Sequence, residues 1–206
     1  MTVPAAYPHG AAPTGAAAAE AARLQAALPR LETDRLILRA PRIEDFALYG
    51  AIMMSDRAVH MDGPLSRRDA WLDFCQCVAC WTLRGHGLWA IEARDSGATL
   101  GFIPTCFEDG DLEPELGWFI DEAAEGRGIA FEAAEAVKAW ALDSLALPAL
   151  VSYIDPPNAR SIALAERLGA WPDPVASVEL SRAQGADVLV YRHAPADDDG
   201  GMEAYA

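Results

Sequence analysis

The segment EGRGIAFEAAEAV, residues 125–137, follows closely on the apolar run ELGWFI, residues 115–120. The apolar run predicts a buried strand, and the alanine-rich segment has the apolar spacing of a helix. Between them, Gly126 and Gly128 flank an arginine, and the small Ala130 follows. A strand, a glycine turn and a helix in this order predict either an ordinary tight turn or a cradle for an anion. The cradle is possible because the first N–H groups of a helix have no partner within the helix.

Two other phosphate-binding motifs are excluded at this turn. A P-loop ends its glycine run in Gly-Lys followed by Ser or Thr, and no such tripeptide occurs in the chain. A dinucleotide-binding fingerprint needs a Gly or Ala three residues after its second glycine, and that position is Phe131 here.

A second segment, NARSIALAERLGA, residues 158–170, arrives one predicted strand later. Asn158 and Ser161 stand at its start, and Gly169 near its end is typical of a helix C-terminus. Taken alone, Asn158 is also what an ordinary helix cap looks like. Together, the two segments favour the anion cradle over the plain turn.

The remaining patterns predict one α/β domain with a mixed sheet over residues 31–194. Before it lies an alanine-rich arm, residues 1–30, which we expect to be flexible and in which 16–28 is either a short helix or a solvated segment. An acidic tail over 195–206 is expected to be flexible as well. Within the domain, helices are predicted over 42–54, 66–83 and 131–145, and hairpins over 87–108 and 176–194. Strands 115–120 and 149–155 should form a parallel pair joined by a helical crossover.

Composition narrows the class of protein. The chain has 206 residues and a net charge of −15, which argues against nucleic acid as a partner. The acidity suits a cationic amine substrate, or it serves solubility alone. No apolar run reaches the roughly 20 residues of a membrane helix, and no secretory signal is evident, so we expect a cytoplasmic protein without membrane contact.

The four cysteines, Cys75, Cys77, Cys80 and Cys106, raise the question of a metal site. Only Cys77 and Cys80 have the spacing of a zinc-binding pair, and no second pair accompanies them. The sequence therefore favours packing of all four in the core, with no metal; redox pairing stays open.

Four segments in their order along the chain resemble the GNAT superfamily of acyl-CoA N-acyltransferases, and within it the RimJ/RimL-type acetyltransferases. They are LETDRLILRAPRIEDF (31–46), GLWAIEARDSGATLGFI (87–103), GRGIAFEA (126–133) and NARSIALAERLGA (158–170). The resemblance covers residues 31–193. It implies a mostly antiparallel sheet with one splayed parallel pair, flanked by helices, in a monomer or homodimer.

The resemblance also implies an acetyl-CoA site. The helix after the glycine turn would bind the pyrophosphate, and the pantetheine arm would lie between strands 115–120 and 149–155. The residues implied in binding are Trp118, Phe119, Ile120, Gly126, Arg127, Gly128, Ile129, Ala130, Asn158 and Ser161. Glu125 departs from the family motif, which has Gln or Arg at that position, so we expect its side chain to point away from the phosphates.

The implied reaction is direct transfer of an acetyl group from acetyl-CoA to a primary amine, on a protein N-terminus or a small molecule, within a ternary complex. Such chemistry needs a base for the amine, a donor for the developing oxyanion and a proton for the leaving thiolate. Glu115 is the candidate base, with Glu113 and Asp111 as poorer substitutes.

A backbone N–H near residues 117–119 is the implied oxyanion donor. The tyrosine that often protonates the thiolate in this family is replaced by Ala165, so the resemblance assigns that role to Ser161. The acceptor pocket is predicted to include His60, Asp62, Trp71 and Trp89. The alternative is a non-catalytic acyl-CoA-binding module, in which the cradle persists without a working base.

Overall fold

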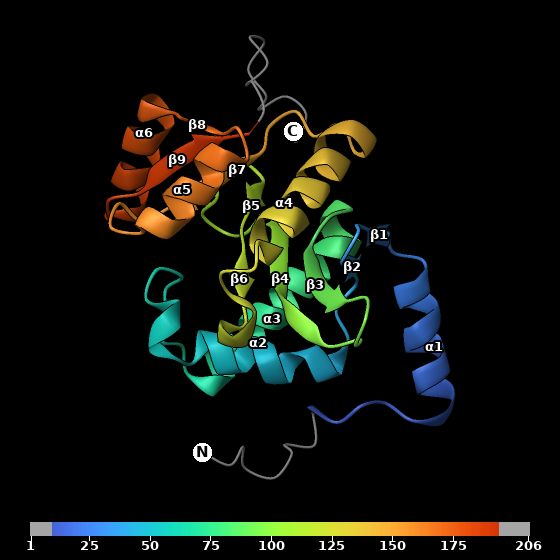
Figure 1. Ribbon diagram of the computed structural model, residues 1–206. Helices are drawn as coiled ribbons and strands as arrows, with labels where there is room; N and C mark the ends of the chain where they lie inside the picture. Colours follow the sequence, from blue (N-terminus) through green and yellow to red (C-terminus); the bar gives the residue numbers. More distant parts are fainter. Residues whose placement is uncertain (1–9, 194–206) are drawn as a thin grey trace.

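A computed structural model describes residues 10–193 of the chain and confirms a mixed α/β fold built on one open sheet (Figure 1). The strand order is β1-β2-β3-β4-β5-β7-β9-β8, with β6 also paired to β4. Every pairing is antiparallel except that of β5 with β7, which is parallel as predicted. The strands are β1 Leu31–Glu32, β2 Leu36–Arg39, β3 Leu88–Ala93, β4 Thr99–Cys106, β5 Glu115–Leu116, β6 Phe119–Ile120, β7 Val151–Ile154, β8 Trp171–Pro172 and β9 Leu189–Arg192.

Helices cover both faces of this sheet. They are α1 Gly15–Ala26, α2 Phe46–Met53, α3 Arg67–Arg84, α4 Ile129–Ala139, α5 Ala159–Arg167 and α6 Pro174–Gln184. Short 3-10 turns lie at Ile43–Asp45, Asp56–Ala58 and Glu122–Ala124, and a π-helical turn at Trp140–Ser144 extends α4. As predicted, Ser66 caps α3, accepting a hydrogen bond from the backbone N–H of Asp69. No helix within residues 10–193 is long and apolar enough to cross a membrane.

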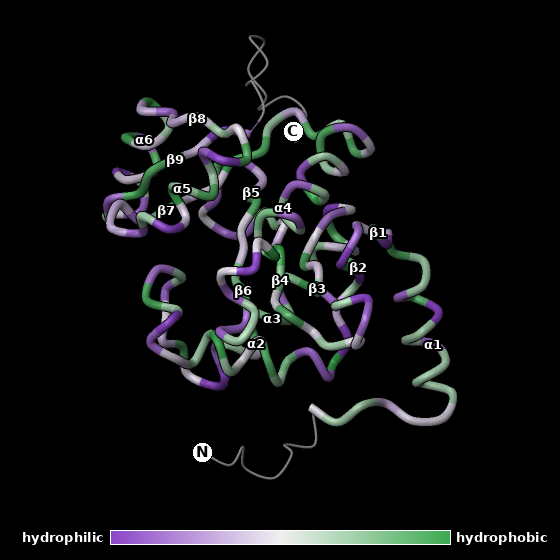
Figure 2. The backbone as a smooth tube through the Cα atoms, viewed as in Figure 1, coloured by the Kyte–Doolittle hydropathy of each residue, from purple (hydrophilic) through white to green (hydrophobic). Residues whose placement is uncertain are grey.

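The apolar core lies in two layers, one on each face of the central strands. Helices α2 and α3 cover one face, packing Tyr49 and Phe74 onto Phe102 of β4. Helix α4 covers the other, where Val137 and its neighbours pack with Ile103. Figure 2 shows the apolar residues concentrated along β3 and β4 at the centre of the fold.

The LETDRLILRAPRIEDF segment owes its pattern to a buried ion pair. The Arg39 guanidinium on β2 donates to both oxygens of the Asp45 carboxylate, at 2.7 and 3.0 Å, and to Glu92 on β3 at 2.6 Å. Asp45 also accepts the backbone N–H of Arg42 at 2.6 Å, which begins the turn into α2. These contacts hold the turn that leads into α2 against strands β2 and β3.

The prediction of a closing hairpin over 176–194 is wrong in its first half, which is helix α6. Asp173 caps this helix by accepting the N–H groups of Val175 and Ala176, and Pro174 occupies its first turn. Gly185 ends it with φ of +70°. The helix therefore has recognisable start and stop residues, and only the second half of the predicted hairpin contains a strand, β9.

The predicted strand 115–120 is divided into β5 and β6. The break falls at Gly117, whose N–H donates to the carbonyl of Pro104 on β4. Because Pro104 has no backbone N–H, it cannot donate the return hydrogen bond, and the ladder is interrupted there. The predicted helix 131–145 begins earlier, at Ile129, and its α-helical part ends at Ala139. Within the alanine-rich arm, α1 is a helix with no buried residue, and residues 195–206 of the predicted tail lie outside the described residues.

Candidate active site

The two parallel strands pair only at their beginning and then part. Glu115 lies opposite Val151, and the Val151 N–H donates to the Pro114 carbonyl at 3.0 Å. At the next step the Ser152 hydroxyl donates to the Leu116 carbonyl at 2.5 Å. Beyond it, both strands line a cavity of about 930 Å³ that reaches from α2 and α3 to the start of α4. The parting of β5–β6 from β7 therefore opens the sheet itself to a ligand.

A backbone donor is exposed at this opening. The Gly117 N–H donates to the Pro104 carbonyl on β4 at 2.9 Å. Because successive N–H groups along an extended chain point to opposite edges, the Trp118 N–H is directed away from β4, toward the side of β7. Among residues 10–193 it has no hydrogen-bond partner. Within residues 117–119, the Trp118 N–H is therefore a backbone donor that faces the opening, and its role as the oxyanion donor stays a prediction.

The glycine turn has the geometry of an anion cradle. Gly126 and Gly128 have φ of +70° and +77°, which favours glycine over any residue with a side chain. Gly128 is the N-cap of α4, has no side chain to cap the helix, and accepts the first helical hydrogen bond from Glu132. The N–H groups of residues 128–131 therefore precede the first helical donor, and Gly128, Ile129, Ala130 and Phe131 all line the cavity.

Glu125 lies at this cradle but does not stand alone. Its two carboxylate oxygens accept hydrogen bonds from Arg57, at 2.5 Å, and from Arg160, at 2.8 Å. By contrast, the predicted ligand residue Arg127 does not line the cavity. It lines a separate smaller pocket, and its carbonyl accepts a hydrogen bond from Arg35 at 3.0 Å.

The start of α5 brings the second predicted motif to the same cavity. The Asn158 side chain caps the helix by accepting the N–H of Ser161 at 3.2 Å, so the capping interpretation of Asn158 is confirmed. The Ser161 hydroxyl accepts the indole N–H of Trp118 at 3.3 Å, which leaves its own hydrogen available for donation. Phe119 and Ile120, also predicted, line the cavity from β6, and Phe119 packs on Tyr49 of α2.

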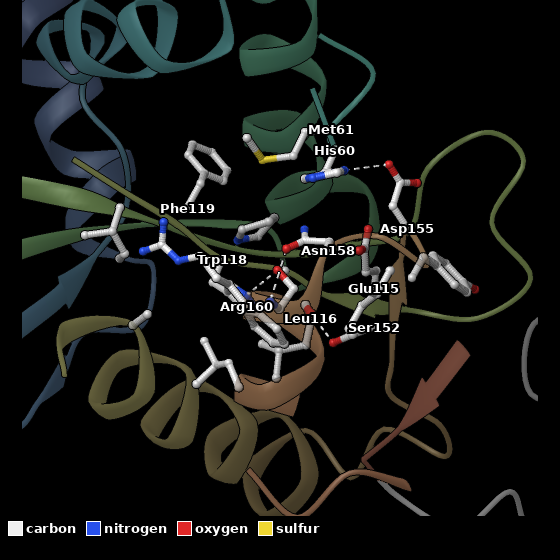
Figure 3. Close-up of a pocket in the computed structure, with 18 of the residues that line it drawn as sticks. His60, Met61, Glu115, Leu116, Trp118, Phe119, Ser152, Asp155, Asn158 and Arg160 are labelled. Atoms are coloured by element: carbon white, nitrogen blue, oxygen red, sulfur yellow. Dashed lines mark hydrogen bonds and ion pairs between the residues drawn. The ribbon is translucent and has the colours of Figure 1, made fainter. Parts of the chain in front are cut away.

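Glu115 is partly enclosed in the wall of the cavity, on the side that also holds Asp155 and His60 (Figure 3). Burial raises the pKa of this carboxyl to about 8, and the charges of Asp111 and Glu108 add to the rise. A carboxyl with a pKa near neutral suits a general base. Glu113, the predicted substitute, does not line the cavity and instead pairs with Arg192 at 2.7 Å.

Six carboxyl groups line the half of the cavity beside α2 and α3. None of them forms an ion pair within residues 10–193; they are Asp62, Asp73, Glu108, Asp109, Asp111 and Glu115. Burial, followed by the charges of other members of the group, raises the pKa of Asp73 and of Asp111 to about 6. The cationic side chains Arg57 and Arg160 lie instead with Glu125 at the cradle. The cavity is therefore divided into a cationic end and an anionic end.

The predicted acceptor residues divide into two groups. His60 and Asp62 line the cavity, and the His60 Nδ1 lies 3.0 Å from a carboxylate oxygen of Asp155. Trp89 does not, because it is fully buried in the core and donates to Thr105 at 3.1 Å. Trp71 packs on Phe46 outside the cavity lining.

The cysteines are mostly in the core, as predicted, since Cys77, Cys80 and Cys106 are buried; Cys75 is exposed, which corrects the prediction for that residue. The thiol of Cys77 donates to the Glu108 carboxylate at 3.1 Å. Sulfur atoms of Cys77 and Cys106 and an oxygen of Glu108 lie within 4.8 Å of one another. The absence of a metal remains a prediction.

Residues 35–170 match the family described as the acetyltransferase (GNAT) domain, which makes the protein an acyltransferase by class. The chain belongs to the GNAT acetyltransferase family. Its fold resembles that of an acetyltransferase from Agrobacterium tumefaciens str. C58, with a TM-score of 0.76 and 39% identity over 82% of this chain and 96% of that one.

Two further relatives frame the family. The uncharacterized protein YkkB of Bacillus subtilis (strain 168) is 28% identical over 167 residues, or 73% of this chain and 94% of its own length. The ribosomal L7/L12 alpha-N-protein acetyltransferase RimL, solved in complex with coenzyme A, has a TM-score of 0.62 over 82% of this chain and 100% of its own. At 16% identity, that likeness concerns the fold alone. The predicted resemblance to RimL-type acetyltransferases is therefore confirmed for the fold.

Several residues that line the cavity were not predicted from the sequence. Arg57 and Asp73 lie on a short turn and a helix far from either motif, so no local pattern placed them at the cavity. Tyr153 was overlooked as well; its hydroxyl accepts the Glu113 N–H at 2.9 Å and donates to the Glu113 carbonyl at 3.0 Å, which holds the 107–114 loop. The available signal was the position of Tyr153, directly after Ser152 on the predicted strand 149–155.

Proposed function

We propose that the protein is an N-acetyltransferase that moves an acetyl group from acetyl-CoA to a primary amine by direct transfer in a ternary complex. The observation that carries the proposal is one continuous cavity with an uncapped helix N-terminus at one end and the Glu115 carboxyl near the other. The glycine turn fits a diphosphate, and the gap between β5–β6 and β7 fits an extended arm that hydrogen-bonds to strand edges. RimL, which shares the fold, was solved with coenzyme A, and this supports the choice of donor.

Three groups of the chain would carry the chemistry. Bound acetyl-CoA supplies an activated thioester. Glu115, ionised above its raised pKa, takes the proton that the ammonium of the acceptor must lose before its nitrogen can form the new C–N bond. The Trp118 N–H donates to the thioester carbonyl oxygen as negative charge develops there. Once the C–N bond has formed, the nitrogen loses its second proton to solvent, and the C–S bond breaks. Ser161 gives its hydroxyl proton to the departing sulfur and recovers one from solvent. Two protons therefore leave the nitrogen and one reaches the sulfur, so that the products are an amide, a thiol and one released proton.

The acceptor of this proposal is a cationic amine. Six carboxyl groups without an ion-pair partner face the end of the cavity where the acceptor would enter. A positively charged acceptor would relieve their mutual repulsion, whereas an anionic one would add to it. The protein is therefore expected to prefer a linear diamine over an amino alcohol of the same length. The two molecules differ only in the second ammonium group, so a difference in rate reports on that charge.

Binding and turnover test the proposal separately. Acetyl-CoA should raise the melting temperature of the protein in a concentration-dependent way, since a ligand of the folded state stabilises it. Thiol release should then depend on both acetyl-CoA and an amine, with the diamine ahead of the matched amino alcohol. Binding without amine-dependent thiol release would favour the non-catalytic acyl-CoA-binding module. No stabilisation at millimolar acetyl-CoA would refute both.

A further inference from the structure

Glu125 stands at the mouth of the cradle, where a lone carboxylate would repel a phosphate. Its two oxygens are instead occupied by two guanidiniums, those of Arg57 and Arg160. The arginines come from opposite sides of the cavity, one from the Asp56–Ala58 turn and the other from the first turn of α5. All three residues line the cavity together with the start of α4. Glu125 therefore joins two segments that are about a hundred residues apart in sequence.

Arg57 is fixed more firmly than a surface arginine. One of its nitrogens, Nη2, donates to Glu125 at 2.5 Å and to the backbone carbonyl of Ile120 at 2.7 Å. The two acceptors are the last residue of β6 and Glu125, which stands just before the glycine turn. The side chain keeps 31% of its exposure, and its Nε and Nη1 have no partner within residues 10–193. Donors of a pinned guanidinium are thus left over beside the helix N-terminus.

Arg160 complements it from the other side. Its contact with Glu125 uses only Nη2, and its side chain is 78% exposed, so its remaining donors are also unoccupied within the described residues. The three side chains together carry one net positive charge. A guanidinium presents parallel N–H groups that match phosphate oxygens, and the positive end of α4 lies beside them.

We infer that Arg57 and Arg160 bind the diphosphate group of the acyl-CoA and that Glu125 is a positioning residue that holds both guanidiniums at the cradle. This inference rests on the proposed function. It explains how the site tolerates a carboxylate at a position where a donor is expected: the donors are supplied by two residues outside the glycine turn. Arg127, whose carbonyl is tied to Arg35 and whose side chain lies away from the cavity, plays no part.

Ligands that differ only in their phosphates test the assignment. Calorimetric titrations of coenzyme A, 3′-dephospho-CoA and pantetheine would be made with the wild type, Arg57→Gln and Arg160→Gln. Arg182→Gln is the matched control, because Arg182 is exposed on α6, outside the cavity lining, and its loss changes the net charge equally. We expect each cradle variant to bind coenzyme A and 3′-dephospho-CoA at least about tenfold more weakly, by the same factor for both, as the loss of a charge-assisted contact implies. Pantetheine binding and the control should be unchanged.

Other outcomes overturn the inference in distinct ways. A loss confined to coenzyme A would place the arginines on the 3′-phosphate instead of the diphosphate. An equal loss of pantetheine binding would show that the variants damage the fold, because pantetheine has no diphosphate to contact. In that case Arg57→Lys, which keeps the positive charge, would not restore binding either. Unchanged affinities would remove both arginines from the site. If the wild type itself does not bind coenzyme A, the proposed function fails, and this result is separate from all of these.

The positioning role of Glu125 has its own readout. In a double-mutant cycle on 3′-dephospho-CoA binding, the penalty of Arg57→Gln should shrink at least about threefold once Glu125 is replaced by alanine, because an unheld guanidinium contributes less. Independent, additive penalties would contradict the positioning role while leaving the arginine contacts intact.

Discussion

The raised pKa of Glu115 makes a prediction about the pH dependence of the reaction. With a pKa of about 8, only about a tenth of this carboxyl is ionised at pH 7. If Glu115 is the base, kcat/KM should rise about tenfold per pH unit below pH 7 and level off above pH 8. Glu115→Gln should lower kcat/KM by about 10²- to 10⁴-fold, the usual contribution of a general base.

Asp111 allows the cause of this pKa to be tested, because after burial its charge is the largest influence on Glu115. Asp111→Asn removes the charge and keeps an oxygen to accept the Glu108 N–H, which lies 2.7 Å away. A fall of one unit in the Glu115 pKa corresponds to about 1.4 kcal/mol and raises the ionised fraction at pH 7 from about a tenth to about a half. The variant should therefore be about fivefold faster at pH 7 and no faster at pH 9, since both proteins are then mostly ionised.

The assay measures the initial rate of thiol release with one amine across a range of about pH 5.5–9.5. The titration of the amine itself is the same in both proteins, so a difference between their profiles belongs to the protein. Glu179→Gln, on the exposed face of α6, controls for the change in net charge. A wild-type profile that is flat between pH 6 and 9, or an Asp111→Asn profile that coincides with it, would refute the role given to Glu115.

Three further predictions follow from the site and its support. Gly128→Ala puts a residue with a side chain at φ of +77°, a conformation that costs about 1–2 kcal/mol. We expect the free turn to relax away from it; because acetyl-CoA needs this conformation, it should then bind about 5- to 30-fold more weakly in a calorimetric titration, and unchanged affinity would argue against the cradle. Ser161→Ala should lower kcat by about a hundredfold with little change in KM for acetyl-CoA, whereas a kcat within about twofold of wild type would leave Ser161 a helix-start residue only. Asp45→Asn should lower the free energy of unfolding, measured in urea at pH 7, by about 1–3 kcal/mol, because the buried Arg39 loses its charge-assisted hydrogen bonds to Asp45 and keeps only Glu92 as a carboxylate partner. Burial works to raise the pKa of Asp45, but Arg39, the Arg42 N–H and Thr99 outweigh it, so the folded pKa lies below the unfolded one. The wild type should therefore lose stability as the pH falls through about 4 and below, while Asp45→Asn should lack this part of the loss; parallel pH profiles would contradict the assignment.

The sequence predicted those parts of the fold that local chemistry determines. The serine cap of α3 and the glycine turn into α4 have signals within a few residues, and the order strand, helix, strand predicted the parallel pair of strands 115–120 and 149–155. Helix α6 was not predicted, although Asp173 and Pro174 mark its start.

The candidate site was predictable only where its residues lie on the motifs. Gly128, Ser161 and Glu115 belong to segments with recognisable patterns, and all three line the cavity. Arg57 and Asp73 are brought there by the packing of the α2–α3 region on the sheet, and Glu108 and Asp109 by the 107–114 loop; no pattern in the sequence specifies either placement. The partners of Glu125 could not be foreseen for the same reason: charge balance at a site depends on groups distant in the chain.

The most direct test of the account is a product balance. Purified protein would be incubated with acetyl-CoA and a linear diamine, and N-acetylated amine and free coenzyme A would be quantified together by mass spectrometry, with Glu115→Gln in parallel. We predict equal amounts of both products, formed far faster with the wild type than with the variant, and no acetyl group retained on the protein. Coenzyme A release without N-acetylated product, or equal rates for the two proteins, would contradict direct transfer to an amine with Glu115 as the base.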